Sequence, residues 1–348
     1  MAEWLQGGPQ TQLVTAELVE QLTAAAGSCG PVVQVRPRSD DYGVADAMRI
    51  WPTVHRIQTD WLRRNQSPPV SFEVWDDHGD LHCAVASPKR KIAELRQHIE
   101  ATYREANVSE GAPAVPFEAG SHVASVTLPL RRRSLLPIRR YDVEGFESDP
   151  YGPLLAAIAG TEDDHVEVVC VQVLAKPAKN SWVDGGLFGS DVGTVAEMLR
   201  SSSLRESTFG TYEVDASKVE RQTANVVQAQ RGLRAFHVDV RVVVQASNEF
   251  DAVRRASSVA HVFERYYTSQ VGQGFERSVL RGSDIESMLE AVASRSMTAE
   301  GLGLLSVPEL AGIGHVPGMT TLVSPTAEGE ITPYDMVPED APSFEGES

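Results

Sequence analysis

Apolar and polar residues alternate along the chain with two periods, and each change of period predicts a strand or a helix. In the first third, the pattern indicates a strand, a helix, a hairpin, a second helix and an edge strand. These elements are expected at residues 32–35, 47–61, 70–75 with 81–86, 92–103 and 106–118. The sequence Asp77-His78-Gly79-Asp80 is a turn signal between the two hairpin strands. This β-α-β-β-α-β order predicts a ferredoxin-like (split βαβ) unit over residues 30–118.

The same order of elements recurs in the second third of the chain. Its strands and helices are expected at residues 123–128, 154–159, 165–175, 236–245, 248–267 and 275–280. The strand at 165–175 is the most apolar of the chain, which predicts burial on both faces and a central place beside the strand at 236–245. These elements predict a second ferredoxin-like unit over residues 119–280.

Three further segments complete the predicted organisation. An insertion at residues 184–232 is expected to be helical, with a short helix near 195–199 and an amphipathic helix at 214–233. Residues 1–29 are expected to form an N-terminal helical arm and 281–324 a helical or irregular segment. Residues 325–348 hold seven acidic side chains and neither lysine nor arginine, which predicts a disordered acidic tail. The predicted fold class is therefore α+β: two ferredoxin-like units, the second with a helical insertion, and a tail.

Composition and charge narrow the classes of protein that fit. Apolar residues make up 42% of the 348, as in folded proteins, and no window has the ~18 consecutive apolar residues of a spanning helix. The start lacks the basic and apolar regions of a cleaved signal, and three scattered cysteines make no disulfide framework. We therefore expect a cytoplasmic protein with reduced thiols. Its net charge of −17 excludes nucleic-acid binding by the whole surface but leaves a local basic face open.

Motifs that carry chemistry are mostly missing. No lysine follows a glycine, so the phosphate-binding loop of ATPases is absent, and no G-x-S-x-G elbow occurs. The glycines at 312–318 are expected to form a flexible turn rather than a dinucleotide site. His82 and Cys83 point to opposite faces of a strand, so with His78 they do not predict a zinc site. We expect no catalytic residue, no cofactor and no metal.

One basic cluster stands out from the acidic background. It consists of Arg131, Arg132, Arg133, Arg139 and Arg140, which lie within ten residues. The cluster can be a solvated rim that compensates nearby acids, or it can contact an anion, a nucleic acid or an acidic partner.

Several short segments, in their order and spacing, resemble a known family. They are Ser71-Phe72-Glu73, Ser87-Pro88-Lys89-Arg90, Asn180-Ser181-Trp182 and Ser306-Val307-Pro308-Glu309-Leu310-Ala311. Together with the sequence around them they are similar to the N-terminal, non-ATPase portion of coupling-type DNA translocases of conjugative type IV secretion systems. The likeness covers most of residues 31–318. It implies a scaffold of ferredoxin-like units that, in the family, leads into a motor domain with Walker motifs.

The resemblance breaks off after Gly318, where the acidic tail follows instead of a motor. It therefore implies a non-catalytic accessory subunit of a DNA-translocation machine, whose partner is a P-loop motor ATPase on a separate chain. Such a subunit would be cytoplasmic, or peripheral to a membrane-bound secretion complex. The alternative is a structural protein of a mobile element or virus particle, and a third hypothesis is an enzyme with an unrecognised site. The sequence leaves homo-oligomerisation and direct nucleic-acid contact open.

Overall fold

A computed structural model provides the structure of the chain. It describes residues 9–29, 31–38, 43–56, 60–61, 64–65, 67–87, 89–111, 115–132, 135–141, 150–159, 165–179, 182, 192–201, 203–207, 210–269, 271–298, 303–318, 324–325 and 331–332.

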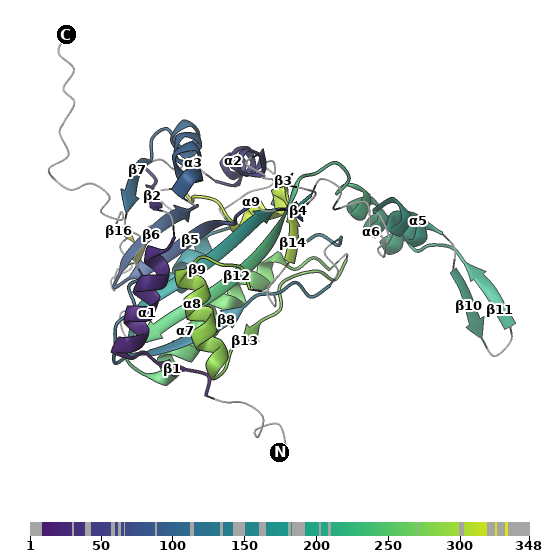
Figure 1. The fold of residues 1–348 in the computed structure, drawn as a ribbon. Helices are drawn as coiled ribbons and strands as arrows, with labels where there is room; N and C mark the ends of the chain where they lie inside the picture. Colours follow the sequence, from purple (N-terminus) through teal and green to yellow (C-terminus); the bar gives the residue numbers. More distant parts are fainter. Residues whose placement is uncertain are drawn as a thin grey trace, which may run out of the picture.

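One antiparallel sheet of ten strands organises the described chain (Figure 1). Its strand order is β1-β8-β12-β9-β5-β6-β2-β7, with β13 beside β8 and β14 beside β12. The ten strands are β1 (Gln12–Leu13), β2 (Val32–Arg36), β5 (Val70–Asp77), β6 (Asp80–Ala86), β7 (Asn107–Gly111), β8 (His122–Thr127), β9 (Val166–Pro177), β12 (Ala235–Ala246), β13 (Ser278–Val279) and β14 (Gly303–Ser306). Three separate pairs lie outside this sheet: β3 (Asp60–Trp61) with β4 (Arg64–Asn65), β10 (Ser203–Ser207) with β11 (Gly210–Val214), and β15 (Ser324–Pro325) with β16 (Ile331–Thr332).

The sheet has two halves with the same internal order of strands. In each half the fourth strand lies beside the first, the first beside the third, and the third beside the second: β7-β2-β6-β5 and β13-β8-β12-β9. The halves join where β5 pairs with β9, with Val74 opposite Val171. On its other side, β9 pairs with β12 over most of its length. The predicted adjacency of the two most apolar strands is therefore confirmed, as is the hairpin of β5 and β6.

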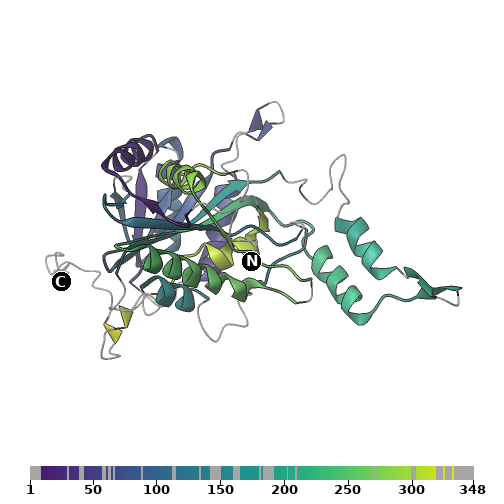
Figure 2. The same ribbon diagram turned by 90° about the horizontal axis from the view of Figure 1, so that it is seen from below.

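Helices cover both faces of this sheet. They are α1 (Ala16–Gly27), α2 (Val44–Arg56), α3 (Lys89–Thr102), α4 (Gly152–Ala159), α5 (Val192–Arg200), α6 (Lys218–Gln228), α7 (Glu249–Val262), the 3-10 helix η3 (Phe263–Tyr266), α8 (Ser283–Ala293) and α9 (Val307–Ile313). Apolar side chains of α2, α3, α4, α7 and α9 pack on one face, and those of α1 and α8 on the other. Figure 2 shows α1 and α8 on the opposite side of the sheet from α4 and α7. The predicted N-terminal helix, α1, therefore packs on the sheet together with α8.

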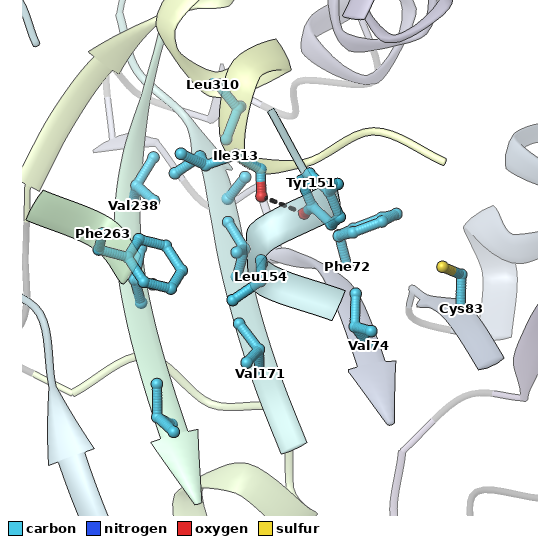
Figure 3. Close-up of a cluster of buried hydrophobic side chains, with 14 of the residues drawn as sticks. Phe72, Val74, Cys83, Tyr151, Leu154, Val171, Val238, Phe263, Leu310 and Ile313 are labelled. Atoms are coloured by element: carbon cyan, nitrogen blue, oxygen red, sulfur yellow. Dashed lines mark hydrogen bonds between the residues drawn. The ribbon is translucent and has the colours of Figure 1, made fainter. Parts of the chain in front are cut away.

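Strand β9 shows why both faces need helices. Val169 and Val171 point into the core beneath α4 and α7, whereas Val168 and Cys170 point into the core beneath α1 and α8. All four side chains are at most 1% exposed. The larger core is drawn in Figure 3, where Val171 and Leu154 lie between Val74 and Phe263. The prediction that this strand is buried on both faces is confirmed.

The glycine-containing segment at the end of α9 and directly after it differs from the flexible turn that its sequence suggests. It runs through the interior, where aromatic side chains donate hydrogen bonds to its carbonyls: Tyr266 Oη to Gly312, Tyr151 Oη to Ile313 (2.6 Å, dashed in Figure 3) and Trp51 Nε1 to Gly314. The carbonyls that a surface turn would present to water are satisfied here by the protein itself. The turn prediction was wrong because these donors come from residues far away in the chain.

The insertion forms an arm that projects from the body in both ribbon views (Figures 1 and 2). Its helices α5 and α6 pack together, and between them lies the β10–β11 hairpin, which the sequence pattern did not predict. Helix α6 is shorter than predicted, because the preceding residues pair in β11 and Ser217 caps the helix. Ser217 and Glu220 form a capping box. Residues 184–191 lie outside the described residues.

Of the predicted acidic tail, residues 325–348, the structure describes only Pro325, which ends β15, and the two residues of β16. The domain boundaries stay a prediction. Among the described helices, none has the length and apolarity that crossing a membrane requires.

Candidate functional site

The predicted arginine cluster lies in the loop that follows β8. Arg131, Arg132 and Arg139 are exposed, and Arg140 is half-buried. Arg133 lies outside the described residues. Four of the five arginines can therefore be placed, and three of them present their side chains to solvent.

This loop is held against the segment between η3 and β13. The backbone N–H of Arg131 donates to the carbonyl of Gly274 (3.0 Å), and that of Arg139 donates to the carbonyl of Tyr266 (2.8 Å). Buried Gln273 anchors the loop between these points, because its Nε2 donates to the carbonyl of Leu136 (2.9 Å). The arginines are thus mounted on a fixed backbone.

The same segment brings two more arginines to this place. They belong to a repeated tripeptide, Phe263-Glu264-Arg265 and Phe275-Glu276-Arg277. The two phenylalanine rings pack edge to face, 5.6 Å between centroids, which sets the two tripeptides side by side. Sequence reasoning missed Arg265 and Arg277, and the repeat is the signal that could have found them.

Arginine side chains here stack on tyrosine rings. Arg131 Cζ lies 5.5 Å from the ring centroid of Tyr267, and on Tyr141 the corresponding distances are 5.3 Å for Arg139 and 5.9 Å for Arg265. These are cation–π distances. We call this place the arginine–tyrosine surface; its members are Arg131, Arg132, Arg139, Arg140, Arg265, Arg277, Tyr141 and Tyr267.

Acidic side chains compensate only part of this charge. Glu264 forms an ion pair with Arg277 (Nη2 to Oε1, 3.4 Å) and contacts His261. Glu276 is exposed. Among the described residues of the two tripeptides and the loop, there are six arginines and two glutamates. A hollow of about 410 Å³ opens beside β13, with Arg131, Arg277 and both glutamates among its lining residues. The surface can therefore attract an anion in an otherwise acidic chain.

The arm joins the body next to this surface. Leu135 and Leu136, in the arginine loop, pack on a small apolar cluster formed by Val192 of α5 and Val227 of α6. Farther along the arm, Met198 is 67% exposed and Val219 58% exposed. The arm is therefore attached through its base, and apolar side chains farther out are left in solvent.

A buried ion pair lies on the face of the sheet that α1 and α8 cover. Arg295 donates to both oxygens of Glu73, at 2.8 and 3.1 Å, and Ser71, Trp75 and Gln172 complete the shell of that carboxylate. Burial on its own raises the pKa of Glu73, but the Arg295 guanidinium and the hydrogen bonds outweigh it and leave the pKa lowered. The pair fastens the end of α8 to the sheet centre.

A second buried pair continues this network. Arg241 Nη2 lies 2.6 Å from Asp239 Oδ2, and its Nη1 donates to Gln172 Oε1. Thr298 donates to the same Asp239 oxygen through its backbone N–H and its hydroxyl. The charged groups of this network are buried and paired with one another, so the network holds the fold together. Among the described residues, only Oδ2 of Asp239 has partners, and its buried Oδ1 has none.

The three residues considered for a metal site lie in different environments. Cys83 is fully buried in the larger core, His82 is partly buried on the other side of β6, and His78 bonds Asp77 in the turn. In the described part of the chain, no group of three or more His, Cys, Asp or Glu residues could hold a metal ion.

Asp76, near the end of β5 and next to the hairpin turn, has a carboxyl group with a raised pKa. Burial raises it to about 6, although Asp76 accepts a hydrogen bond from Gly79 N. As the pH rises from 3.8 to 6, the unfolded chain loses this proton first, so ionisation favours the unfolded state. We expect Asp76→Asn to match the wild type below pH 4 and to exceed its stability by about 1–3 kcal/mol above pH 6. Urea unfolding at both pH values measures this; equal stabilities at pH 7 contradict it.

Comparison with known proteins identifies the family of the chain. No curated protein matches the chain. A family model described as a domain of unknown function (DUF8128) matches residues 4–327. Because that match spans nearly the whole sequence, the chain belongs to this family.

Proposed function

We propose that the protein is a non-catalytic accessory subunit of a DNA-translocation or conjugative, type IV secretion-like machine, and that it binds a separate P-loop motor ATPase. The segment similarity to coupling-type translocases suggests the machine. The single structural observation that carries the proposal is the arm, which extends from a sheet that helices cover on both faces (Figure 1). An extension of this kind is a contact element rather than a part of the core.

The composition of the arm supports this role. Met198 and Val219 lie on different helices of the arm and are both mostly exposed. Exposed large apolar side chains forgo about 1.5–3 kcal/mol each of burial free energy, which a partner surface would recover. The base of the arm is fixed by apolar packing and by the hydrogen bond from Trp182 Nε1 to the carbonyl of Leu233 (2.8 Å). A fixed base limits the entropy lost when the arm is bound.

We further infer that each half of the sheet is a ferredoxin-like unit. The support is that both halves have the element order β-α-β-β-α-β and the same neighbour order of strands. The β5–β9 pairing then makes one rigid platform of the two units, and the arm leaves the second unit between its second and third strands.

The test is co-purification of a tagged full-length chain from the cells that encode it. We expect a P-loop ATPase to be retained, as identified by mass spectrometry. Changing Met198→Asp together with Val219→Asp should reduce its retention at least tenfold, because carboxylates would have to be desolvated in the contact. Phe250→Asp is the matched control, since Phe250 is 74% exposed at the start of α7 on the body, and it should retain the ATPase.

Two outcomes contradict the proposal. In one, no P-loop ATPase is retained by the wild-type chain, and the chain sediments with virus particles instead. In the other, the ATPase is retained equally by the wild type and by the doubly substituted arm.

A further inference from the structure

We infer that the arginine–tyrosine surface binds single-stranded nucleic acid, with arginine forks on the phosphates and the ring of Tyr267 beneath a base. This goes beyond the proposed function, because it assigns a ligand to a surface that the arm does not use and that needs no motor for binding.

Charge is the first argument. The chain as a whole carries −17 and repels a polyanion, so a nucleic acid can approach only where positive charge is concentrated. Arg131, Arg132, Arg139 and Arg277 are exposed within one structural neighbourhood, built from the β8 loop and the segment before β13. All of the cations there are arginines, whose planar forks match phosphate oxygens better than lysine does.

The arginines are held in place before any ligand arrives. Arg131 Nε donates to the carbonyl of Phe275 (3.3 Å), which leaves the rest of its fork at the surface. The guanidinium of Arg132 lies across the turn at Gly272, 3.2–3.3 Å from where a Cβ would stand. Gly272 has φ +62°, so the turn itself favours glycine. Less side-chain entropy is then lost on binding.

Aromatic rings supply the second element of the argument. Tyr267 is 43% exposed and Arg131 Cζ lies 5.5 Å from its ring centroid, so the residue is partly open to solvent at a cationic position. Base–aromatic stacking next to arginine is how proteins bind single strands without sequence preference.

These features favour a single strand over the other polyanions. In a duplex the bases are already stacked on one another, so Tyr267 would add nothing to phosphate contacts. An acidic peptide would pair with the arginines but has no flat ring to lay on the tyrosine. Only a strand with unpaired bases can therefore contact both the arginines and the ring of Tyr267.

The experiment measures fluorescence anisotropy of a labelled oligothymidine of about 20 nucleotides on the full-length protein. We expect saturable binding that weakens steeply between about 50 and 200 mM salt. Arg131→Ser with Arg132→Ser should weaken binding at least tenfold and lower the log–log salt slope by roughly 1.4, since each single-strand phosphate contact contributes about 0.7. The matched control is Arg96→Ser with Arg254→Ser, which removes two partly exposed arginines from α3 and α7 and should change neither quantity.

The tyrosine separates a single strand from other ligands. Tyr267→Ala should weaken oligothymidine binding at least fivefold and leave a duplex of equal length unaffected, whereas Tyr267→Phe should bind as the wild type does. Absence of binding by the wild type, or equal losses in the control pair, would overturn the inference. So would polyglutamate binding that oligothymidine does not compete with, because the surface would then serve an acidic protein.

Failure of this inference is distinguishable from failure of the proposed function. The variants of Arg131 and Arg132 should still retain the motor ATPase. Conversely, the variants of Met198 and Val219 in the arm should still bind oligothymidine.

Discussion

Replacing Val171 by aspartate is expected to lower the free energy of unfolding by at least about 4 kcal/mol, enough to leave much of the protein unfolded at 37 °C. Val171 lies at the centre of β9, opposite Val242 of β12 on one side and Val74 of β5 on the other. It is 1% exposed and packs in the larger apolar core. An aspartate there would bury a carboxylate with no cation beside it on the apolar face.

Chemical unfolding followed by circular dichroism measures the effect. Val219→Asp introduces the same carboxylate on α6, where the side chain is 58% exposed, and should change the stability by less than about 0.5 kcal/mol. A Val171→Asp protein that melts like the wild type would show that β9 is not at the centre of the sheet.

The second large effect is expected from Arg295→Met. The substitution leaves Glu73, which is 0% exposed, without its cation, and breaking a buried pair in this way costs about 3–5 kcal/mol. Because the pKa of Glu73 is lowered in the folded protein, the pair stabilises the fold above pH 4.5 and loses this contribution as the pH falls through the folded pKa. The difference between wild type and variant should therefore be largest near pH 7 and shrink as the pH falls below 4.5.

Two companion variants make this prediction specific. Glu73→Gln together with Arg295→Met removes both charges and should recover part of the loss. Arg96→Met breaks an exposed i,i+4 pair with Glu100 and should cost no more than about 0.5 kcal/mol. Equal effects of Arg96→Met and Arg295→Met, or a loss that does not depend on pH, would contradict the role assigned to the buried pair.

The sequence predicted those parts of the fold that depend on local pattern. The turn at residues 77–80 joins β5 and β6 in a hairpin, and the long apolar run in β9 is buried on both faces. Both follow from side-chain alternation and turn chemistry over a few residues. The pairing of β9 with β12 also followed, because two runs of that apolarity need the most buried positions of a sheet.

Features set by distant contacts could not be predicted in this way. Glu73 and Arg295 are 222 residues apart, and each reads as an ordinary surface charge in its local sequence. The segment at 312–316 looks like a loop until the donors from Trp51, Tyr151 and Tyr266 are placed around it. The β10–β11 hairpin was missed because its strands are short and lie in a stretch rich in serine.

The candidate site shows the same division. Five arginines within ten residues marked the loop after β8, and that is local information. Arg265, Arg277 and Tyr267 complete the site. Tertiary hydrogen bonds, such as the one from Arg139 N to Tyr266 O, bring these residues to the loop. A repeated tripeptide has no meaning as a site until the two copies are known to lie together.

The most direct test of the proposed role is lysine cross-linking of the native complex with the motor ATPase, read by mass spectrometry. The chain has five lysines, of which Lys218 alone lies on the arm, exposed at the start of α6, whereas Lys89 and Lys91 lie on α3 of the body. We predict that cross-links to the ATPase come from Lys218 and disappear when Met198 and Val219 are both replaced by aspartate. Cross-links that come only from Lys89 and Lys91, and persist in that variant, would contradict the account.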